Sequence, residues 1–346
     1  MVAPTDIPSL ARFILSPECR HIGVLTGAGI SVASGIPDFR SPGGLYDQLQ
    51  PDHLTTTTER QRQLLASDPM HVVSWEMFSQ NAFPYLEVRR PFILGTQQGR
   101  WKPTVAHRFL ELLHAKTGKL QRIYTQNIDG LHFLCDTIPS SKVIPVHGSI
   151  NQVECEGCQA PMEFDVFCGK LSAQIRDIYD EDDKAPQESR PILCENCRKP
   201  LVKPSTVLFG RSLPRTFFDH LPNDAMNWDM LLVLGTSLLV SPANSVVPSA
   251  VDPNKKRPTV RVLINRDCVG TELGLNFSAP EVGLNVLDDD LAPSSDLFLQ
   301  GDCDDVTLQL IVELGWLDDV AKYDLPPESA EKVERAQQDN AFKSWF

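Results

Sequence analysis

Five short apolar runs constrain the fold of this chain more than any other feature of its sequence. Each run is followed by a glycine or a polar residue, and they are His21–Thr26, Arg122–Thr125, Val143–Val146, Met230–Leu234 and Arg261–Ile264. Such runs are typical of parallel strands buried on both faces of a sheet. Because helix-type spacing of apolar residues lies between them, we predict a doubly wound, mostly parallel α/β sheet. Ligands of such sheets bind at the carboxyl ends of the strands, where these polar residues collect.

Two C-x-x-C pairs predict a metal site: Cys155 with Cys158, and Cys194 with Cys197. Four thiolates in two such pairs suit a tetrahedral zinc ion, and a site with four protein ligands is closed and structural. The gap between the pairs exceeds the usual ~15–20 residues. We therefore expect residues 151–203 to form a small inserted lobe that zinc stabilises. The alternative, redox-active or unpaired thiols, is disfavoured by the pairing.

The charge and cysteine content exclude several classes of protein. The chain has 346 residues and a formal net charge of −13, which argues against binding nucleic acid through its phosphates. Its nine cysteines are not the pattern of a secreted disulfide scaffold. The N-terminus does not resemble a signal peptide, and no run approaches the ~18 apolar residues of a membrane span. We expect a soluble cytoplasmic or nuclear protein without membrane partners.

The first predicted strand leads into a glycine turn, Thr26–Ser31, that should open a helix. Glycines let backbone N–H groups approach a pyrophosphate, whose charge a helix N-terminus favours. Gly27 and Gly29 match the start of the dinucleotide pattern G-x-G-x-x-G, but Val32 replaces its third glycine. By itself the turn is a weak signal, and a tight strand–helix turn without a ligand is an equal alternative.

The order of the motifs resembles the sirtuins, the NAD-dependent protein-lysine deacylases. After the glycine turn comes the loop S-G-I-P-D-F-R-S-P from Ser34, which looks like a lid over a ligand. T-Q-N-I-D from Thr125, V-H-G from Val146, the two cysteine pairs and G-T-S-L from Gly235 follow in the family's order. The resemblance covers roughly residues 8–315 and is greatest to the class I branch.

The resemblance implies a division into lobes. A Rossmann-type NAD-binding lobe would consist of residues 8–50, 103–150 and 204–318. Residues 51–102 would form a helical insertion on the cofactor side, and residues 151–203 the zinc-binding lobe. For the C-terminal tail, residues 319–346, the sequence leaves open whether it docks or stays mobile.

NAD as a co-substrate and one zinc ion are the ligands that the resemblance implies. The residues that match the family's NAD site are Gly27, Ala28, Gly29, Ile36, Asp38, Phe39, Arg40, Gln126, Asn127, Ile128, Asp129, Gly235, Thr236, Ser237, Asn265 and Cys303. The glycine turns and Arg40 would hold the phosphates. Asn265 and Cys303 would lie near the adenosine, and residues 126–129 would face the ribose and nicotinamide.

His147 matches the family's catalytic base, and Asn127 is the second catalytic candidate. In the implied reaction the acetyl oxygen displaces nicotinamide from the ribose, and a base then takes a proton from a ribose hydroxyl. Histidine, with an unperturbed pKa near ~6.5, suits that task at neutral pH. The products are free lysine, nicotinamide and acetylated ADP-ribose.

Val207, Leu208, Phe209 and Gly210 match the segment that pairs with the substrate backbone as an added strand. The implied partners are acetylated lysine peptides or proteins, such as histones or tubulin. Arg211 is a departure, because the family often has glutamate there. It puts in doubt the charge preference around the bound peptide.

The expected acyl group is acetyl, and removal of longer fatty acyl groups is a second expectation. Sirtuins that remove succinyl or malonyl groups carry a Tyr-x-x-Arg pair, which this chain lacks. Phe78 and Asn81 stand where the pair would fall, so we expect an apolar acyl pocket.

Three alternative functions stay open at this point. A protein mono-ADP-ribosyltransferase would use the same NAD site and the same first bond cleavage. The missing third glycine disfavours an NAD dehydrogenase. A zinc-binding module without catalytic activity is disfavoured because His147, Asn127 and Asp129 are all present. The acidic run Asp177–Asp183 suggests in addition that the zinc lobe steers a basic peptide toward the site.

Overall fold

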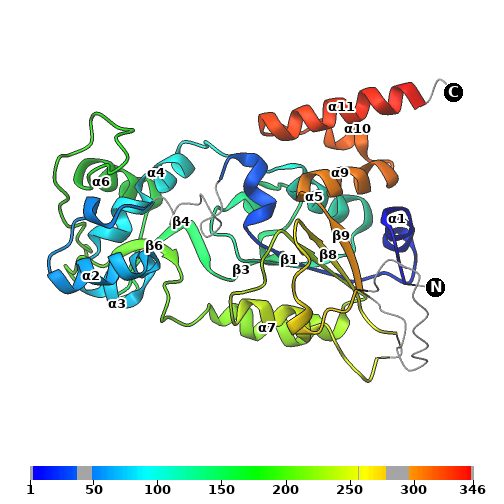
Figure 1. Ribbon diagram of the computed structural model, residues 1–346, viewed down its shortest axis with the longest axis horizontal. Helices are drawn as coiled ribbons and strands as arrows, with labels where there is room; N and C mark the ends of the chain where they lie inside the picture. The colour runs from blue at the N-terminus through cyan, green and yellow to red at the C-terminus, as the bar shows by residue number, and fades with distance from the viewer. Residues whose placement is uncertain (1–2, 37–48, 256, 278–295, 344–346) are drawn as a thin grey trace.

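Six parallel strands form the central sheet of the computed structural model, which describes residues 3–36, 49–255, 257–277 and 296–343 (Figure 1). They are β1 (Ile22–Thr26), β2 (Leu120–Thr125), β3 (Val143–Pro145), β7 (Met230–Leu234), β8 (Val260–Asn265) and β9 (Asp296–Gln300). Their order in the sheet is β3-β2-β1-β7-β8-β9. The predicted doubly wound sheet is confirmed, and the strand order reverses between β1 and β7.

Strand β9 is the one strand of this sheet that was not predicted from the sequence. It pairs with β8 in parallel register and is the last strand in the order of the sheet, with one further bridge from Asp296 to Phe277. Of its five residues only Leu297 is buried. An edge strand covered on one face need not be a continuous apolar run, which is why the criterion that found the other five strands missed it.

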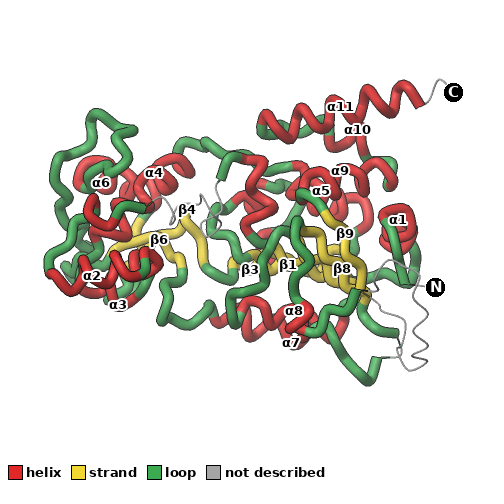
Figure 2. The backbone as a smooth tube through the Cα atoms, in the orientation of Figure 1, coloured by secondary structure: helices red, strands yellow, loops and turns green. Residues whose placement is uncertain are grey.

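Helices cover both faces of the sheet (Figure 2). On one face α1 (Ile7–Leu15), α5 (Val105–Thr117) and α9 (Cys303–Glu313) share a hydrophobic core with strand residues such as Val24 and Leu232. On the other, α7 (Arg215–Asn227) and α8 (Val246–Ser249) pack on Leu25 and Leu231. Side chains of successive strand residues thus pack into the cores on opposite faces of the sheet, as the two-residue repeat of a strand requires. None of the described helices is long and apolar enough to cross a membrane.

The C-terminal segment docks on the first of these faces. After α10 (Leu317–Val320), α11 (Pro327–Lys343) contacts α9, α10 and residues 28–34. Ser329 is fully buried and its hydroxyl donates to the Asp304 carboxylate at 2.5 Å. Trp345 and Phe346 lie outside the described residues.

A second lobe is built around a three-stranded antiparallel sheet of order β5-β4-β6. Its elements are β4 (Gly148–Cys155), β5 (Pro161–Met162), β6 (Val202–Thr206), α2 (Glu59–Ser67), α3 (Trp75–Gln80), α4 (Phe83–Gln97) and α6 (Phe164–Gln174). Phe78 and Phe92 from the segment 51–102 share one hydrophobic core with Phe167 and Val202. The two segments therefore fold as one packed unit beside the main sheet (Figure 1).

Short 3-10 helices fill many of the connections between these elements. Their bounds are Ala28–Ser34, Pro51–His53, Pro69–Val73, Leu131–Leu134, Ser140–Lys142, Ala243–Ser245 and Thr271–Leu273. The helix expected after the first glycine turn is thus a 3-10 helix, not an α-helix. It ends at Gly35, which adopts a left-handed conformation with φ of 81°.

Two glycine turns meet where the strand order reverses. The N–H of Gly29 donates to Gly235 O at 2.8 Å, and the N–H of Gly27 donates to Leu234 O at 2.9 Å. A Cβ atom on Gly235 would lie 2.7 Å from the carbonyl carbon of Gly29. Gly235 also has a positive φ of 60°, which side chains other than hydrogen disfavour. The turns can approach this closely only because both positions are glycine.

Gly235→Ala is therefore expected to lower the free energy of unfolding by about 2–5 kcal/mol, through left-handed strain and overpacking together. Gly274→Ala is the matched control, since Gly274 has φ of 83° but nothing within 4 Å of an added Cβ. Only the strain applies there, and a loss of about 1–2 kcal/mol is expected. Urea unfolding measures both losses, and equal values would contradict the close contact assigned to Gly235.

Candidate active site

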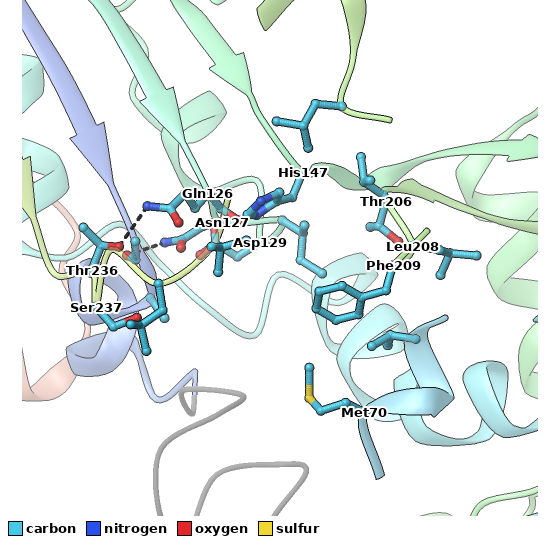
Figure 3. A pocket seen from close by; sticks show the side chains of 18 of the residues that line it. Met70, Gln126, Asn127, Asp129, His147, Thr206, Leu208, Phe209, Thr236 and Ser237 are labelled. Atoms are coloured by element: carbon cyan, nitrogen blue, oxygen red, sulfur yellow. Dashed lines mark hydrogen bonds between the residues drawn. The ribbon is translucent and has the colours of Figure 1, made fainter. Parts of the chain in front are cut away.

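A cavity of about 480 Å³ lies between the carboxyl ends of the central strands and the second lobe. The turns after β1, β2 and β7 line one side of it, and residues 206–211 together with Met70 and Val73 line the other (Figure 3). Both lobes thus contribute side chains to one space. Its position outside the strand ends is where a doubly wound sheet binds its ligand.

Most of the residues expected to bind NAD line this cavity. They are Gly27, Ala28, Ile36, Gln126, Asn127, Ile128, Asp129, Gly235, Thr236 and Ser237. Gly29 lies behind them, against Gly235. Asp38, Phe39 and Arg40 lie outside the described residues.

Asn265 and Cys303 do not line the cavity, although both lie at the same edge of the sheet. Asn265 ends β8 and its side-chain amide donates to Asp267 O at 2.9 Å. Cys303 begins α9, where burial raises the pKa of its thiol to about 12. Cys303 is therefore a neutral thiol, suited to an apolar contact and not to an ionic one.

Side-chain amides bridge the ends of three neighbouring strands. Gln126, directly after β2, donates to the Thr236 hydroxyl after β7 at 2.9 Å. The Asn127 amide donates to Gly27 O at 2.9 Å and to the Ser31 hydroxyl at 3.1 Å (Figure 3). These bonds fix the amide groups, so the cofactor side of the cavity is preorganised.

Asp129 is the buried carboxylate of this side of the cavity. Its oxygens accept hydrogen bonds from the Ser31 hydroxyl at 2.7 Å and from the Leu131 N–H at 2.9 Å. Burial raises the pKa of Asp129 above its usual value, because a desolvated carboxylate is disfavoured. Ser31 also lines the cavity and was not among the expected residues.

His147 lies between the two sides of the cavity (Figure 3). Its Nδ1 is 2.8 Å from Gln126 O. A carbonyl oxygen can only accept, so Nδ1 carries a proton, and in the neutral form of the ring the lone pair is on Nε2. His147 O in turn accepts the Val207 N–H at 2.8 Å. The imidazole is thus oriented by Gln126, and its backbone is joined to the opposite wall.

Residues 207–210, the expected substrate segment, all line the cavity. Phe209 is already paired along one edge, since its N–H donates to Val73 O and its carbonyl accepts the Trp75 N–H, both at 2.9 Å. Backbone groups of successive strand residues point to opposite edges. A substrate strand would therefore have to pair with the other edge of this segment.

The acyl side of the cavity contains two residues that were not predicted from the sequence, Tyr85 and Arg89. They lie four residues apart on one face of α4, and the Tyr85 hydroxyl is 2.8 Å from that of Thr206. Phe78 and Asn81, where acyl selectivity was sought, are buried outside the cavity lining. Arg89 adds a guanidinium to the lining of the cavity, and the expectation of an apolar acyl pocket stays a prediction. The (i, i+4) spacing of Tyr85 and Arg89 places both side chains on one helix face, but the spacing does not show that this face lines a cavity.

The four cysteines of the two C-x-x-C pairs converge, with all sulfur atoms within 4.8 Å of one another. The Cys155 and Cys197 sulfurs are 3.6 Å apart, as are those of Cys158 and Cys194. Ligands of a tetrahedral zinc ion with ~2.3 Å bonds lie about 3.8 Å apart. The donor set and its dimensions therefore fit one structural zinc ion. Burial raises the pKa of the Cys155 thiol to about 12, so a bound cation would be needed to keep it ionised.

Part of the acidic run 177–183 has a structural role. The Asp177 carboxylate accepts the backbone N–H groups of Tyr179, Glu181 and Asp182 and so closes the loop on itself. Asp182 pairs at 2.6 Å with Arg90, whose side chain is 3% exposed. Asp177 thus shapes the loop and Asp182 holds it to α4, while steering of a substrate by the run stays a prediction.

Comparison with known proteins identifies a family. Residues 27–242 match the model of the Sir2 family. "NAD-dependent deacetylase sir2A" of Dictyostelium discoideum is 34% identical over 90% of this chain and 52% of its own length. "NAD-dependent protein deacetylase hst2" of Schizosaccharomyces pombe is 33% identical over 91% of this chain and 78% of its own length. "NAD-dependent protein deacetylase sirtuin-2" of Danio rerio is 33% identical, over 90% and 72%.

A solved structure, described as "Structural Basis for the Mechanism and Regulation of Sir2 Enzymes", has the same fold. It superimposes with a TM-score of 0.60 at 24% identity. The match covers 90% of this chain and 98% of the solved one. The likeness therefore extends over both lobes.

Cys155→Ala is expected to abolish zinc binding and to lower the melting temperature, since three thiolates leave the tetrahedral site incomplete. Cys168→Ala is the matched control, because Cys168 is a buried thiol of the same lobe outside the cluster. It should keep its zinc and lose only roughly 1 kcal/mol of stability. Metal content by mass spectrometry and thermal unfolding test this. Full zinc content in Cys155→Ala would mean that the cysteines do not share an ion.

Proposed function

The chain belongs to the Sir2 family, and from that membership we propose that it is an NAD-dependent protein-lysine deacetylase. It cleaves NAD, releases nicotinamide and transfers the acetyl group from lysine to ADP-ribose. The observation that carries the proposal is His147, which lies between the glycine turns and residues 207–210 with its Nδ1 bonded to Gln126 O. A base at that position faces a cofactor on one side and an acyl-lysine on the other.

The first bond change requires positioning, not a strong nucleophile from the protein. The acetyl oxygen attacks the ribose carbon, and the nicotinamide leaves with the electrons of the C–N bond. Fixed amides such as Gln126 and Asn127 supply orientation, which can account for a large part of a rate enhancement. The enclosing second lobe would exclude water that would otherwise hydrolyse the sugar.

The second step is the one that His147 performs. Its Nε2 accepts the proton of a ribose hydroxyl, whose oxygen then attacks the carbon of the former acetyl group. Gln126 O, which accepts the Nδ1–H, stabilises the imidazolium that results. Water completes the transfer and leaves the lysine amine free.

Acetylated proteins are the proposed substrates, with histones and tubulin as specific candidates, in the cytoplasm or the nucleus. The cysteines support such a compartment, because none of the nine is joined in a disulfide and four of them fit a zinc site. Free thiols without disulfides are typical of proteins in reducing compartments.

One assay separates deacetylation from the alternatives that share NAD. Purified protein is incubated with an acetylated peptide and NAD, and peptide mass, nicotinamide and NADH are followed together. We expect one acetyl group lost for each nicotinamide released, with no NADH. Mass added to the protein with the acetyl group retained would instead indicate a mono-ADP-ribosyltransferase.

His147→Ala should lower kcat for deacetylation by about 10²–10⁴-fold, the contribution of a general base. NAD binding, measured by calorimetry, should persist because the fixed amides and glycine turns are untouched. His220→Ala provides the control, since His220 lies on α7 outside the cavity lining. Near-normal turnover in His147→Ala would exclude the role assigned to its imidazole.

A further inference from the structure

Arg211 is the exposed charge of the cavity. Among the described residues that line it, the acidic and basic side chains other than His147 are Arg89, Asp129 and Arg211. Arg89 and Asp129 are 6% and 7% exposed, whereas the Arg211 side chain is 42% exposed. A peptide bound at the mouth of the cavity would therefore meet the charge of Arg211 before those of Arg89 and Asp129.

The Arg211 guanidinium is held in a fixed position. It stacks on the Trp75 ring, 4.4 Å from the ring centroid, and its Nη2 pairs with Glu156 at 2.9 Å. Its backbone N–H donates to Leu208 O at 3.0 Å, so it directly continues the substrate segment. A planar guanidinium fixed by stacking loses little entropy when it binds a further carboxylate.

Glu156 does not neutralise Arg211, because it serves a second cation as well. Lys203 Nζ lies 2.9 Å from the other Glu156 oxygen, and its side chain is fully buried. The same Nζ donates to Pro204 O at 2.9 Å and to Thr206 O at 2.6 Å. Three acceptors around one nitrogen require the three N–H bonds of an ammonium ion. Two basic side chains, Lys203 and Arg211, therefore share one carboxylate, so Glu156 is not paired with Arg211 alone.

The guanidinium also has donors to spare. Within the described part of the chain, Nη2 is the one nitrogen of this group that takes part in a hydrogen bond. The remaining N–H groups form a fork that matches a carboxylate in two-point geometry. Asp and Glu side chains present that geometry, whereas a lysine would be repelled.

We propose that Arg211 selects substrates in which an aspartate or glutamate flanks the acyl-lysine. The proposal rests on the function given above, in which the acyl-lysine peptide lies along residues 207–210. If the peptide pairs with residues 207–210 as a strand, the side chains next to its acyl-lysine pass beside Arg211, which directly follows this segment. Where relatives carry a glutamate at this position, the sign of the charge, and with it the preference, would be reversed.

The test uses one acetyl-lysine peptide and varies the two residues on either side of the lysine. Each position carries Glu, Gln or Lys in turn, and kcat/KM is measured at low and at physiological salt. At one or more positions we expect kcat/KM to be highest for the Glu peptide, lower for Gln and lowest for Lys, with kcat/KM about two- to fivefold higher for Glu than for Gln. Added salt should reduce the differences, as it does for exposed charges.

Arg211→Glu should reverse that order, and Arg211→Met should remove it while leaving Glu156 paired with Lys203. Arg215→Glu is the matched control, because it makes the same charge change four residues along, on a side chain 91% exposed. That variant should keep the wild-type order. Zinc content and melting temperature verify that each variant is folded.

Equal rates for the three peptides with the wild-type protein would overturn the role of Arg211 and leave the deacetylase proposal intact. A preference that Arg215→Glu changes as much as Arg211→Glu does would also overturn it, since the general potential would then be the cause. If no peptide is deacetylated at all, the proposed function itself fails. The three results are distinguishable in a single set of assays.

Discussion

The close backbone contact between the turns after β1 and β7 is the constraint on which the rest of the site depends. Hydrogen bonds from Gly29 to Gly235 and from Gly27 to Leu234 join the two strand ends without any side chain between them. Because the ends are this close, amides that follow β2 can span all three strands. Gln126 reaches Thr236, and Asn127 reaches Gly27 O. Larger residues in the turns would separate the strands and remove the support that holds these amides in place.

His147, the proposed base, is tied to both lobes at once, so the position of one lobe would be part of the geometry of the proposed reaction. His147 bonds through its ring to Gln126 O in the main lobe and through its carbonyl to Val207 N. Val207 follows β6, whose Lys203 is joined to Glu156 between two of the cysteines. A continuous set of bonds therefore runs from the cysteine cluster through the substrate segment to the imidazole. A structural ion at that cluster would stabilise the active site without touching a substrate.

The parts of the fold and site that the sequence predicts are those whose physical cause is local. Buried strands, the glycine turns, the cysteine pairs and His147 are each specified by residues adjacent in the chain or by a known spacing. Strand β9 was missed because an edge strand needs no continuous apolar run. Tyr85, Arg89 and the pairing of Arg211 with Glu156 were missed because packing between distant segments creates them. Local patterns carry no information on which helix face lines a cavity, so tertiary contacts alone decide such residues.

The overall charge of −13 gives a misleading view of what a bound peptide would experience. Electrostatic interactions in physiological salt decay over about 8 Å, so only nearby charges act on a residue beside the acyl-lysine. Two acids of the run 177–183 are committed to the loop and to Arg90. At the cavity, by contrast, the exposed charge is a cation that shares its carboxylate with Lys203. A protein of negative net charge can therefore expose a cation beside its cavity, because only the side chains within that distance set the charge that a bound residue meets.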